Sequence, residues 1–429
     1  MIVVSGTGAA QLVTIIASPV LSRIYSPSDF GIYSVAISIL ILSVVTCLRY
    51  EFAIPLPKDE VAAANLLGLA LLANLGMSAA TGAILLLFGP WLLAAFGATV
   101  LTPYVGLLVL AQAGAGILSA LTNWAIRTKS FSAIAVSALS QSGIQSSVQI
   151  GMGLAGLGAP GLLLGTVAGT LAGCVVLANA ALRTHVEAFR RVSWAGVRAV
   201  AVRYRRFPIF SSWSALLGQI GVQAPLLLLV AFYGTGVGGE YALAQRLCLL
   251  PVNLVAGSVG QVFIAEGARL ARTQPDSLRR LFMRTTWTLT RIGVGPAIMI
   301  GVAAPFLIPV VFGQRWQQAG VFVAIMVPMY FFVFVLTSTG DILYVVERQG
   351  LQLAREIARV TLLGGSVLVA GEAHLPPVGA VVALSGVGSL MYLLYGAITW
   401  RAIITHGLHP HPASLREDDP AKGGPQAAE

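Results

Sequence analysis

The chain has 429 residues, of which 57% are hydrophobic and only 10% are charged, and its formal net charge is +10. A soluble domain carries about 25% charged residues, so this composition excludes a soluble globular protein. The basic residues lie in short stretches between apolar runs, which is typical of a membrane protein and argues against nucleic acid as their partner.

The first apolar run follows Met1 directly and has neither the basic flank nor the clear cleavage site of a signal peptide. We therefore predict a retained membrane-spanning helix at 2–22. The missing flank also raises the expectation that the true translation start lies upstream of Met1.

Further apolar runs of about 20 residues follow, each long enough to span a bilayer as a helix. They do not alternate with the period of two that barrel strands show. The sequence thus predicts an all-α polytopic membrane protein with about twelve spans, at 2–22, 30–48, 61–88, 101–124, 131–152, 159–182, 209–232, 241–265, 285–312, 319–340, 353–371 and 377–401. The eleventh is the weakest, because Arg355, Glu356 and Arg359 crowd its start.

Lys and Arg are distributed unequally between alternate loops. With the N-terminus inside, the opposite loops hold only Arg23 and Arg315, and Arg246 and Arg291 fall within spans. The inner side holds the other 22: Arg49, Lys58, Arg127, Lys129, seven arginines from Arg183 to Arg206, five from Arg269 to Arg284, Arg348, Arg355, Arg359, Arg401, Arg416 and Lys422. This excess predicts that both termini lie in the cytoplasm.

The longest internal break, the basic cytoplasmic linker 183–206, divides the chain into lobes of six spans each, 1–182 and 207–402. Residues 403–429 are rich in Pro, Ala and charge and predict a disordered cytoplasmic tail. A G-x-Y-x-x-A pattern recurs between the lobes, at Gly31, Tyr33, Ala36 and again at Gly239, Tyr241, Ala244. Unless this is a chance recurrence, the lobes are parallel repeats related by a pseudo-two-fold axis along the membrane normal.

Two arginines lie inside predicted spans, where charge is costly. Arg246 is about six residues into the eighth span, and Arg291 is similarly deep in the ninth. A planar guanidinium that lines a hydrated cleft suits phosphate. The alternative is that both side chains snorkel to nearby headgroups.

Polar rows mark other spans. Gln141, Gln145 and Gln149 share one helix face, as do Gln219 and Gln223. These rows either form hydrogen bonds to a neighbouring helix or line a cavity that admits sugars.

Two pairs of opposite charge, Arg23 with Asp29 and Arg49 with Glu51, are either structural ion pairs or substrate contacts. Asp341 and Glu347 lie near an interface, where a structural role is favoured over a proton or cation site. The candidate substrate-binding residues are Arg246, Arg49, Arg23, Arg291, Gln145, Gln149, Gln223 and Gln245.

No enzyme signature is present. The sequence has no P-loop and no cluster with metal-ligand spacing, so we expect neither cofactor nor metal. Cys47, Cys174 and Cys248 all lie in apolar runs and predict packing roles rather than disulfides.

Several segments resemble the polysaccharide flippase family that exports O-antigen and related repeat units. They are LSRIYSPSDFGIY at 21–33, RYEFAIPLPKDE at 49–60, FPIF at 207–210, EYALAQRLCLLP at 240–251 and FGQRWQQAG at 312–320. Each is short, but together they cover nearly the whole chain in order.

This resemblance implies membership of the multidrug/oligosaccharidyl-lipid/polysaccharide exporters, with two six-helix lobes of MATE-like fold around a cationic cavity. It implies alternating access and an undecaprenyl-pyrophosphate-linked oligosaccharide as substrate. We expect the protein to be a monomer in contact with membrane lipids, and other polysaccharide-assembly membrane proteins are candidate partners. By similarity to the related lipid II flippase, Arg23, Arg49 and Arg246 look like cavity arginines.

Three alternatives stay open from the sequence. A cation-coupled drug exporter of the same superfamily would want acidic cavity residues, whereas the embedded charges here are mostly arginine. A membrane polymerase or ligase of polysaccharide would want a large external loop, and every predicted external loop is short. A scaffold that does not transport is disfavoured only modestly by the embedded arginines.

Overall fold

The computed structural model describes residues 2–40, 47–205, 207–273, 275–340, 342 and 349–406, and every regular element in these ranges is helical. Asp341, Glu347, part of the second predicted span and most of the predicted tail lie outside the described residues. The longer helices are α1 Ile2–Ile24, α2 Pro27–Ile39, α3 Glu60–Ala95, α4 Val105–Arg127, α5 Phe131–Leu154, α6 Ala159–Arg190, α8 Ser212–Pro251, α9 Gly257–Thr273, α10 Pro275–Phe312, α11 Gln317–Gly340, α13 Gln349–Glu372 and α14 Pro377–His406.

Shorter helical elements connect them. They are the 3-10 turns η2 Tyr50–Ala53, η3 Thr99–Tyr104 and η6 Gln314–Trp316, the α-helix α7 Trp194–Arg203, and the π-helical turns η4 Phe207–Ser211 and η5 Val252–Ala256. By length and apolar composition, seven of the described helical segments are able to cross a membrane. The glutamine-rich α5 and the charged α13 are outside that set, although each coincides with a predicted span.

The helix α8 contains most of the seventh predicted span and the first part of the eighth, which continues through η5 into α9. Its backbone leaves helical geometry at Gly234, where φ is +86°. A Cβ at Gly238 would overlap the side chain of Val230, although eight residues of a straight helix rise about 12 Å. The chain therefore folds back at Gly234, and the seventh and eighth spans form a hairpin. The eighth span begins near Thr235, several residues earlier than the sequence predicts.

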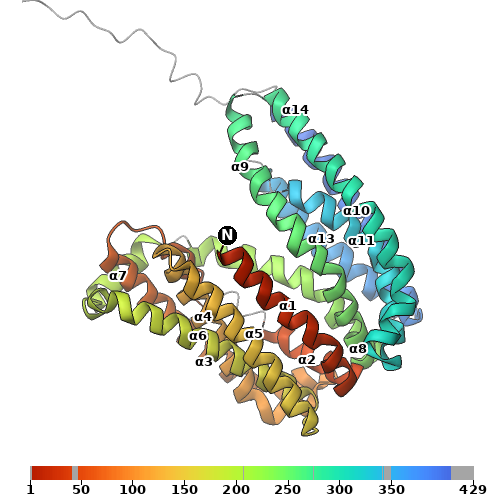
Figure 1. Ribbon diagram of the computed structural model, residues 1–429, viewed down its shortest axis with the longest axis horizontal. Coiled ribbons are helices and arrows are strands. Elements are labelled where there is room, and N and C mark those ends of the chain that lie inside the picture. The colour runs from red at the N-terminus through yellow and green to blue at the C-terminus, as the bar shows by residue number, and fades with distance from the viewer. Residues whose placement is uncertain are drawn as a thin grey trace, which may run out of the picture. The chain divides into compact units, whose positions relative to one another are not determined.

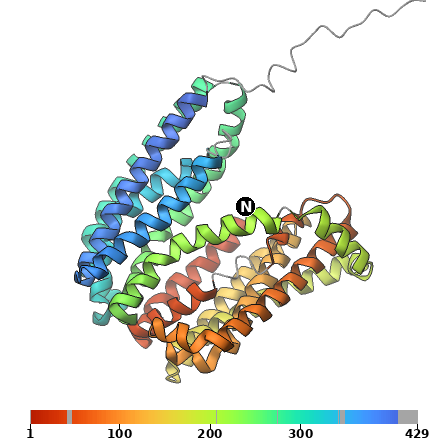
Figure 2. The same cartoon turned by 180° about the vertical axis from the view of Figure 1, so that it is seen from behind.

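Contacts divide the chain into two units. Unit 1 contains the described residues of 1–247, 300–326 and 356–387, and unit 2 those of 248–299, 327–355 and 388–429. Within unit 1, α5 packs along α6 and α1, and α4 packs on α6 and α3, as Figures 1 and 2 show from opposite sides. Within unit 2, a core of Phe263, Leu278, Phe282 and Tyr395 joins α9, α10 and α14.

The repeated G-x-Y-x-x-A pattern makes a reciprocal contact inside unit 1. A Cβ at Gly31 would overlap the carbonyl oxygen of Thr235, and a Cβ at Gly239 would overlap that of Pro27. Thr235 and Gly239 stand 208 residues after Pro27 and Gly31, so each contact is the repeat image of the other. This reciprocity is the form that a two-fold interface takes.

A row of glycines on α6 lets α5 approach closely. Gly161, Gly165, Gly169 and Gly173 recur every four residues and so share one face. A Cβ at Gly165 would overlap Gln149 Cγ and lie 2.9 Å from the Gln145 carbonyl oxygen, and a Cβ at Gly169 would lie 2.6 Å from the Gln141 carbonyl oxygen. Small residues that bring backbones together are a principal device of helix packing in lipid.

We therefore expect Gly165→Ala to destabilise the protein, because an added methyl in a packed interface costs about 1–3 kcal/mol. The matched control is Gly143→Ala on α5, where a Cβ meets nothing within 4 Å. Helix propensity favours alanine there, so Gly143→Ala should be neutral or slightly stabilising. Thermal unfolding of the detergent-solubilised variants measures both, and equal transition temperatures would contradict this account of the α5–α6 interface.

Candidate functional site

The start of α2 fixes the elements around the site. Ser26 and Asp29 form a capping box, in which Asp29 Oδ2 accepts hydrogen bonds from Ser26 N at 2.9 Å and Ser26 Oγ at 2.7 Å. The second oxygen, Asp29 Oδ1, accepts from the Ala159 amide at the start of α6 at 3.1 Å. One carboxylate therefore holds the N-termini of both α2 and α6, where helix dipoles favour negative charge.

A polar cluster forms where α2, α5 and α6 meet. The hydroxyl oxygens of Tyr33 and Thr166 are 2.8 Å apart, and Thr166 Oγ1 donates to the Leu162 carbonyl at 3.0 Å. Gln149 Nε2 donates to the same carbonyl at 3.0 Å, and its side chain also lies within reach of the Tyr33 hydroxyl. Since Thr166 is the donor to Leu162, Tyr33 donates to Thr166, and the three side chains form one network.

Arg246 on α8 completes this cluster. It is exposed and interacts electrostatically with Tyr33. It stands eleven residues after Thr235, or about 17 Å along the helix at 1.5 Å per residue. This is far deeper than the six residues that the sequence suggested, and it weakens the snorkelling interpretation. No carboxylate partner for Arg246 is found among the described residues, so its charge is available to an anion.

The glutamines of the two rows differ in their burial and in their hydrogen-bond partners. Gln149 is buried and bonds the α6 backbone, and Gln145 is half-buried against the glycine row of α6. Gln223 Nε2 donates to Ser38 Oγ at 3.0 Å and joins α8 to α2. The first of the two interpretations, a bond to a neighbouring helix, therefore describes Gln149 and Gln223. Gln245 is half-buried and directly precedes Arg246.

Arg23 and Asp29 do not pair with each other in the described structure. Arg23 Nη2 donates to the Val310 carbonyl of α10 at 3.3 Å, and Asp29 is engaged in helix capping. Nearby, Trp316 Nε1 donates to the Ser22 carbonyl at 2.8 Å. The expected ion pair is therefore absent from this region, and each residue has a structural contact of its own. These bonds tie the end of α1 to α10 and η6.

Arg49 and Glu51 lie in the turn between α2 and α3. Arg49 adopts φ +60°, its guanidinium carbon is 4.1 Å from the centre of the Phe52 ring, and its Nε is buried without a hydrogen-bond partner. Glu51 is buried, and burial raises the pKa of its carboxyl group while its own backbone amide and Arg49 oppose that shift. No described contact joins Arg49 to the Arg246 cluster.

Arg291 lies in unit 2 on α10. It is exposed, and its guanidinium carbon is 5.9 Å from the centre of the Trp287 ring one turn away. Among the described residues, no hydrogen bond or ion pair of the Arg291 side chain is found. Its substrate role remains an expectation from the sequence.

The charges at the start of α13 are engaged inside the protein. In unit 1, Arg359 pairs with Glu356 at 2.6 Å, and its Nη2 donates to the Gly218 carbonyl of α8 at 2.5 Å. In unit 2, Arg355 Nη1 donates to Tyr395 Oη at 2.7 Å. The distribution of Lys and Arg between alternate loops predicts that both arginines lie in a cytoplasmic loop. The structure places them within the helix, where these contacts compensate their charge.

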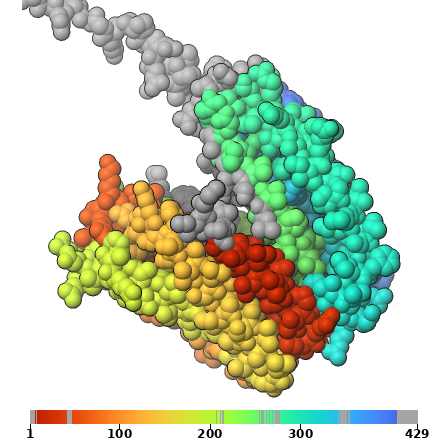
Figure 3. Space-filling view, viewed as in Figure 1, coloured from red at the N-terminus to blue at the C-terminus, as the bar shows by residue number. Residues whose placement is uncertain are grey.

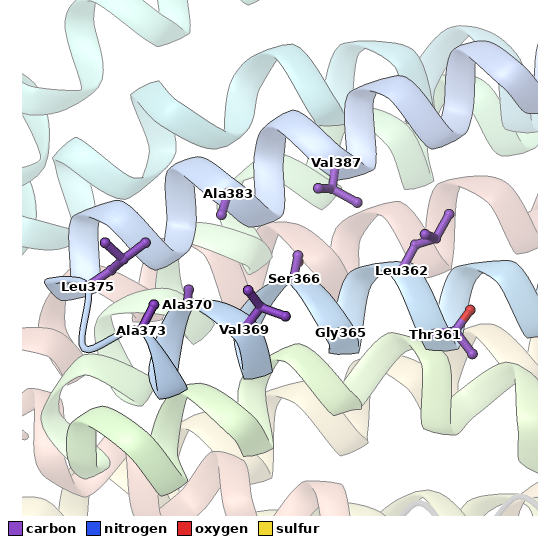
Figure 4. A pocket seen from close by; sticks show the side chains of 10 residues that line it. All are labelled: Thr361, Leu362, Gly365, Ser366, Val369, Ala370, Ala373, Leu375, Ala383 and Val387. Atoms are coloured by element: carbon purple, nitrogen blue, oxygen red, sulfur yellow. The ribbon is translucent and has the colours of Figure 1, made fainter.

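A groove of about 420 Å³ lies between α13 and α14 in unit 1 (Figure 4). Its lining is aliphatic apart from the hydroxyls of Thr361 and Ser366, and both hydroxyls bond carbonyls of their own helix. Small residues such as Gly365 and Ala383 make the hollow. The groove thus offers hydrocarbon contacts and no site for an anion.

The sequence interpretation missed two members of the cluster, Tyr33 and Thr166. Tyr33 stands in the repeated G-x-Y-x-x-A pattern. That pattern marks Tyr33 as a repeated position, but it does not predict that the hydroxyl faces a polar cluster. Its repeat counterpart, Tyr241, is only 1% exposed. Thr166 follows Gly165 in the glycine row, and nothing in the sequence alone links it to α2.

Comparisons with known proteins agree with this architecture. Residues 20–321 match the family described as polysaccharide biosynthesis protein. The amylovoran biosynthesis protein AmsL of Erwinia amylovora is 25% identical over 123 residues, which are 28% of this chain and 31% of that protein. The matched region thus spans about a third of that curated relative.

Solved structures resemble nearly the whole chain. An inward-facing multidrug resistance MATE transporter of the MOP superfamily matches with a TM-score of 0.68 at 13% identity, over 94% of this chain and 96% of the transporter. The lipid II flippase MurJ in an inward closed conformation matches with a TM-score of 0.62 at 13% identity, over 94% of this chain and 90% of the flippase. At these identities the likeness shows the fold, which is MATE-like, as the family resemblance implies.

Proposed function

The chain belongs to the polysaccharide biosynthesis protein family, and on that premise we propose that it is a flippase for an undecaprenyl-pyrophosphate-linked oligosaccharide. The glycan would serve as O-antigen, capsule or exopolysaccharide. We place the protein in the bacterial inner membrane with both termini in the cytoplasm, in keeping with the distribution of Lys and Arg.

One observation carries the proposal. Arg246 lies deep in a membrane-spanning hairpin, exposed and without a described carboxylate partner, beside the Tyr33–Thr166–Gln149 network. An unpaired cation in the membrane is costly, and a diphosphate would offset that cost by accepting two hydrogen bonds from the guanidinium fork. The half-buried Tyr33 hydroxyl beside it is a neutral group that suits sugar hydroxyls, and Thr166 and Gln149 hold it in place.

Transport follows from rearrangement of the two lobes, which are joined by the basic linker. The reciprocal contact between Gly31 and Thr235 and between Gly239 and Pro27 lies at the end that the charge distribution assigns to the outside. It joins the first lobe to the second through backbone atoms in van der Waals contact. We propose that this contact closes the outer side while the headgroup binds from within, and that it opens to release the headgroup outside.

The prenyl chain stays in hydrocarbon throughout, because transferring only the headgroup avoids moving the lipid tail through water. Aliphatic surfaces such as the α13–α14 groove are suited to that chain (Figure 4). The diphosphate and the sugars need the polar cluster instead, since an unsolvated charge in an apolar medium costs many kcal/mol.

The competing drug-exporter function calls for carboxylates that attract cationic drugs. The described cluster around Arg246 contains an arginine, a tyrosine, a threonine and a glutamine. Its electrostatics therefore favour an anionic headgroup.

Deletion of the protein tests the function in cells that lack a second flippase. We expect the lipid-linked oligosaccharide to accumulate on the cytoplasmic face and the wild-type chain to restore export. If the intermediate does not accumulate, and neighbouring steps of glycan assembly are intact, the flippase proposal is wrong and a small-molecule exporter becomes the better hypothesis.

A further inference from the structure

The end of α6 and the helix α7 carry a dense set of exposed arginines. They occupy 183–205, where Glu187 is the sole acidic residue. We call this set the basic face, and its exposed members are Arg183, Arg190, Arg191, Arg198, Arg203 and Arg205. The yellow-green atoms at the left edge of Figure 3 belong to this part of unit 1.

The helix α7 is held firmly against α3, so its outer face is fixed by the fold. Asn65 Oδ1 on α3 accepts a hydrogen bond from the Ser193 amide at 3.1 Å. A Cβ at Gly196 would lie 2.5 Å from Asn65 Nδ2, which leaves no space between the two helices there. Val197 and Val200 are buried on the same side.

The outer face of α7 combines apolar and basic side chains. Trp194, Arg198 and Val202 are spaced by four residues and form one stripe. Trp194 is 75% exposed and Val202 is 61% exposed. Such a face is out of place in bulk water, whereas tryptophan and arginine are both favoured at the membrane–water interface.

The contact with α3 brings this stripe close to the membrane surface. The 36 residues of α3 extend about 54 Å, which exceeds the roughly 40–45 Å of a bilayer with its headgroup regions. Asn65 lies in the second turn of α3, so α7 is attached close to the end of that helix. This end carries the basic residues assigned to the cytoplasm, and α7 therefore lies at the level of the headgroups.

We propose that the outer stripe of α7 and the flanking basic face bind anionic phospholipid headgroups of the cytoplasmic leaflet. Trp194 and Val202 insert at the level of the glycerol backbone, and the arginines attract the headgroup phosphates. Electrostatic attraction to anionic lipid and burial of an apolar stripe are the two components that hold an interfacial helix. The inference concerns the membrane surface and stands independently of the transported substrate.

The test uses the full chain with Ala199→Cys, an exposed position on α7, carrying a spin label; the three native cysteines are buried. The protein is reconstituted into nanodiscs of phosphatidylcholine alone or mixed with phosphatidylglycerol. Accessibility to oxygen and to a water-soluble nickel chelate reports the depth of the label. We expect the label to be deeper with phosphatidylglycerol, and high salt to reverse the difference.

Charge variants separate the basic face from general positive charge. A triple Gln substitution of Arg190, Arg191 and Arg198 should remove most of the difference in label depth between the two lipid mixtures, because these residues supply much of the attraction to anionic headgroups. The same change at three exposed arginines of unit 2 should leave the label at its wild-type depth; these are Arg280, Arg284 and Arg401.

Two outcomes would overturn the proposal. One is a label that stays equally accessible to water in both lipid mixtures at low salt. The other is a label that, in nanodiscs of phosphatidylcholine alone, becomes shielded from water when an acidic cytosolic protein is added. That result would assign the basic face to a protein partner. Trp194→Ala supplies a second check, because it should make the label shallower without removing the salt dependence.

Discussion

Arg246→Ala should lose at least about 30-fold in the rate of headgroup translocation. Removing one partner of a desolvated, hydrogen-bonded charge pair costs about 2–5 kcal/mol. Arg246 is exposed beside Tyr33, and no described carboxylate competes with the diphosphate for its guanidinium. Arg246→Lys keeps the charge but loses the two-pronged donor geometry. We expect it to fall between alanine and wild type in a complementation or reconstituted flipping assay.

The matched control is Arg315→Ala, which changes an exposed arginine in the turn η6, on the side that the charge distribution assigns to the outside. It removes the same charge at a position outside the cluster and should support translocation at a rate close to wild type. Expression levels and thermal unfolding must agree among the variants. If Arg246→Ala translocates as well as Arg315→Ala, Arg246 has a structural role and the diphosphate is bound elsewhere.

A disulfide across the outer contact should arrest transport reversibly. The hydroxyl oxygens of Ser28 and Thr235 are 2.7 Å apart, beside the glycine contact that joins the two lobes. The double variant Ser28→Cys/Thr235→Cys places two thiols at this spacing, which is close to what a disulfide requires. Oxidation should reduce translocation below detection, and a reductant should restore it.

Each single cysteine variant, oxidised in the same way, controls for damage elsewhere, since the native Cys47, Cys174 and Cys248 are buried. The extent of cross-linking is measured by a mobility shift after proteolysis between the two positions. Full cross-linking with an unchanged rate of translocation would mean that the outer contact need not open, and lobe movement at this point would have to be abandoned.

The architecture was largely predictable, because apolar run length fixes where helices can cross a bilayer. Predicted spans such as 61–88 and 159–182 fall within α3 and α6. The errors occurred where tertiary contacts decide the geometry. The eighth span starts near Thr235 because the chain reverses at Gly234, a position whose φ of +86° is accessible to glycine. The helix α7 was hidden in a charge-rich linker, since its burial depends on Asn65.

The site was predictable only in part. A charged residue in a span is a strong single-residue signal, and it led to Arg246. The network beside it draws Tyr33, Gln149 and Thr166 from three helices, and no local spacing in the sequence joins them. The rows of glutamine left two interpretations open. The glycine row on α6, with its spacing of four, was the signal that could have chosen between them.

The most direct test of the central claim is headgroup translocation by the purified chain in proteoliposomes that contain a lipid-linked oligosaccharide. A glycosidase added outside measures how fast the sugar becomes accessible from the inner leaflet. We predict that vesicles with the wild-type chain exchange the headgroup and that protein-free vesicles do not. Equal, slow rates in both, with correctly folded protein and any required ion gradient imposed, would contradict the assignment of this chain as a flippase.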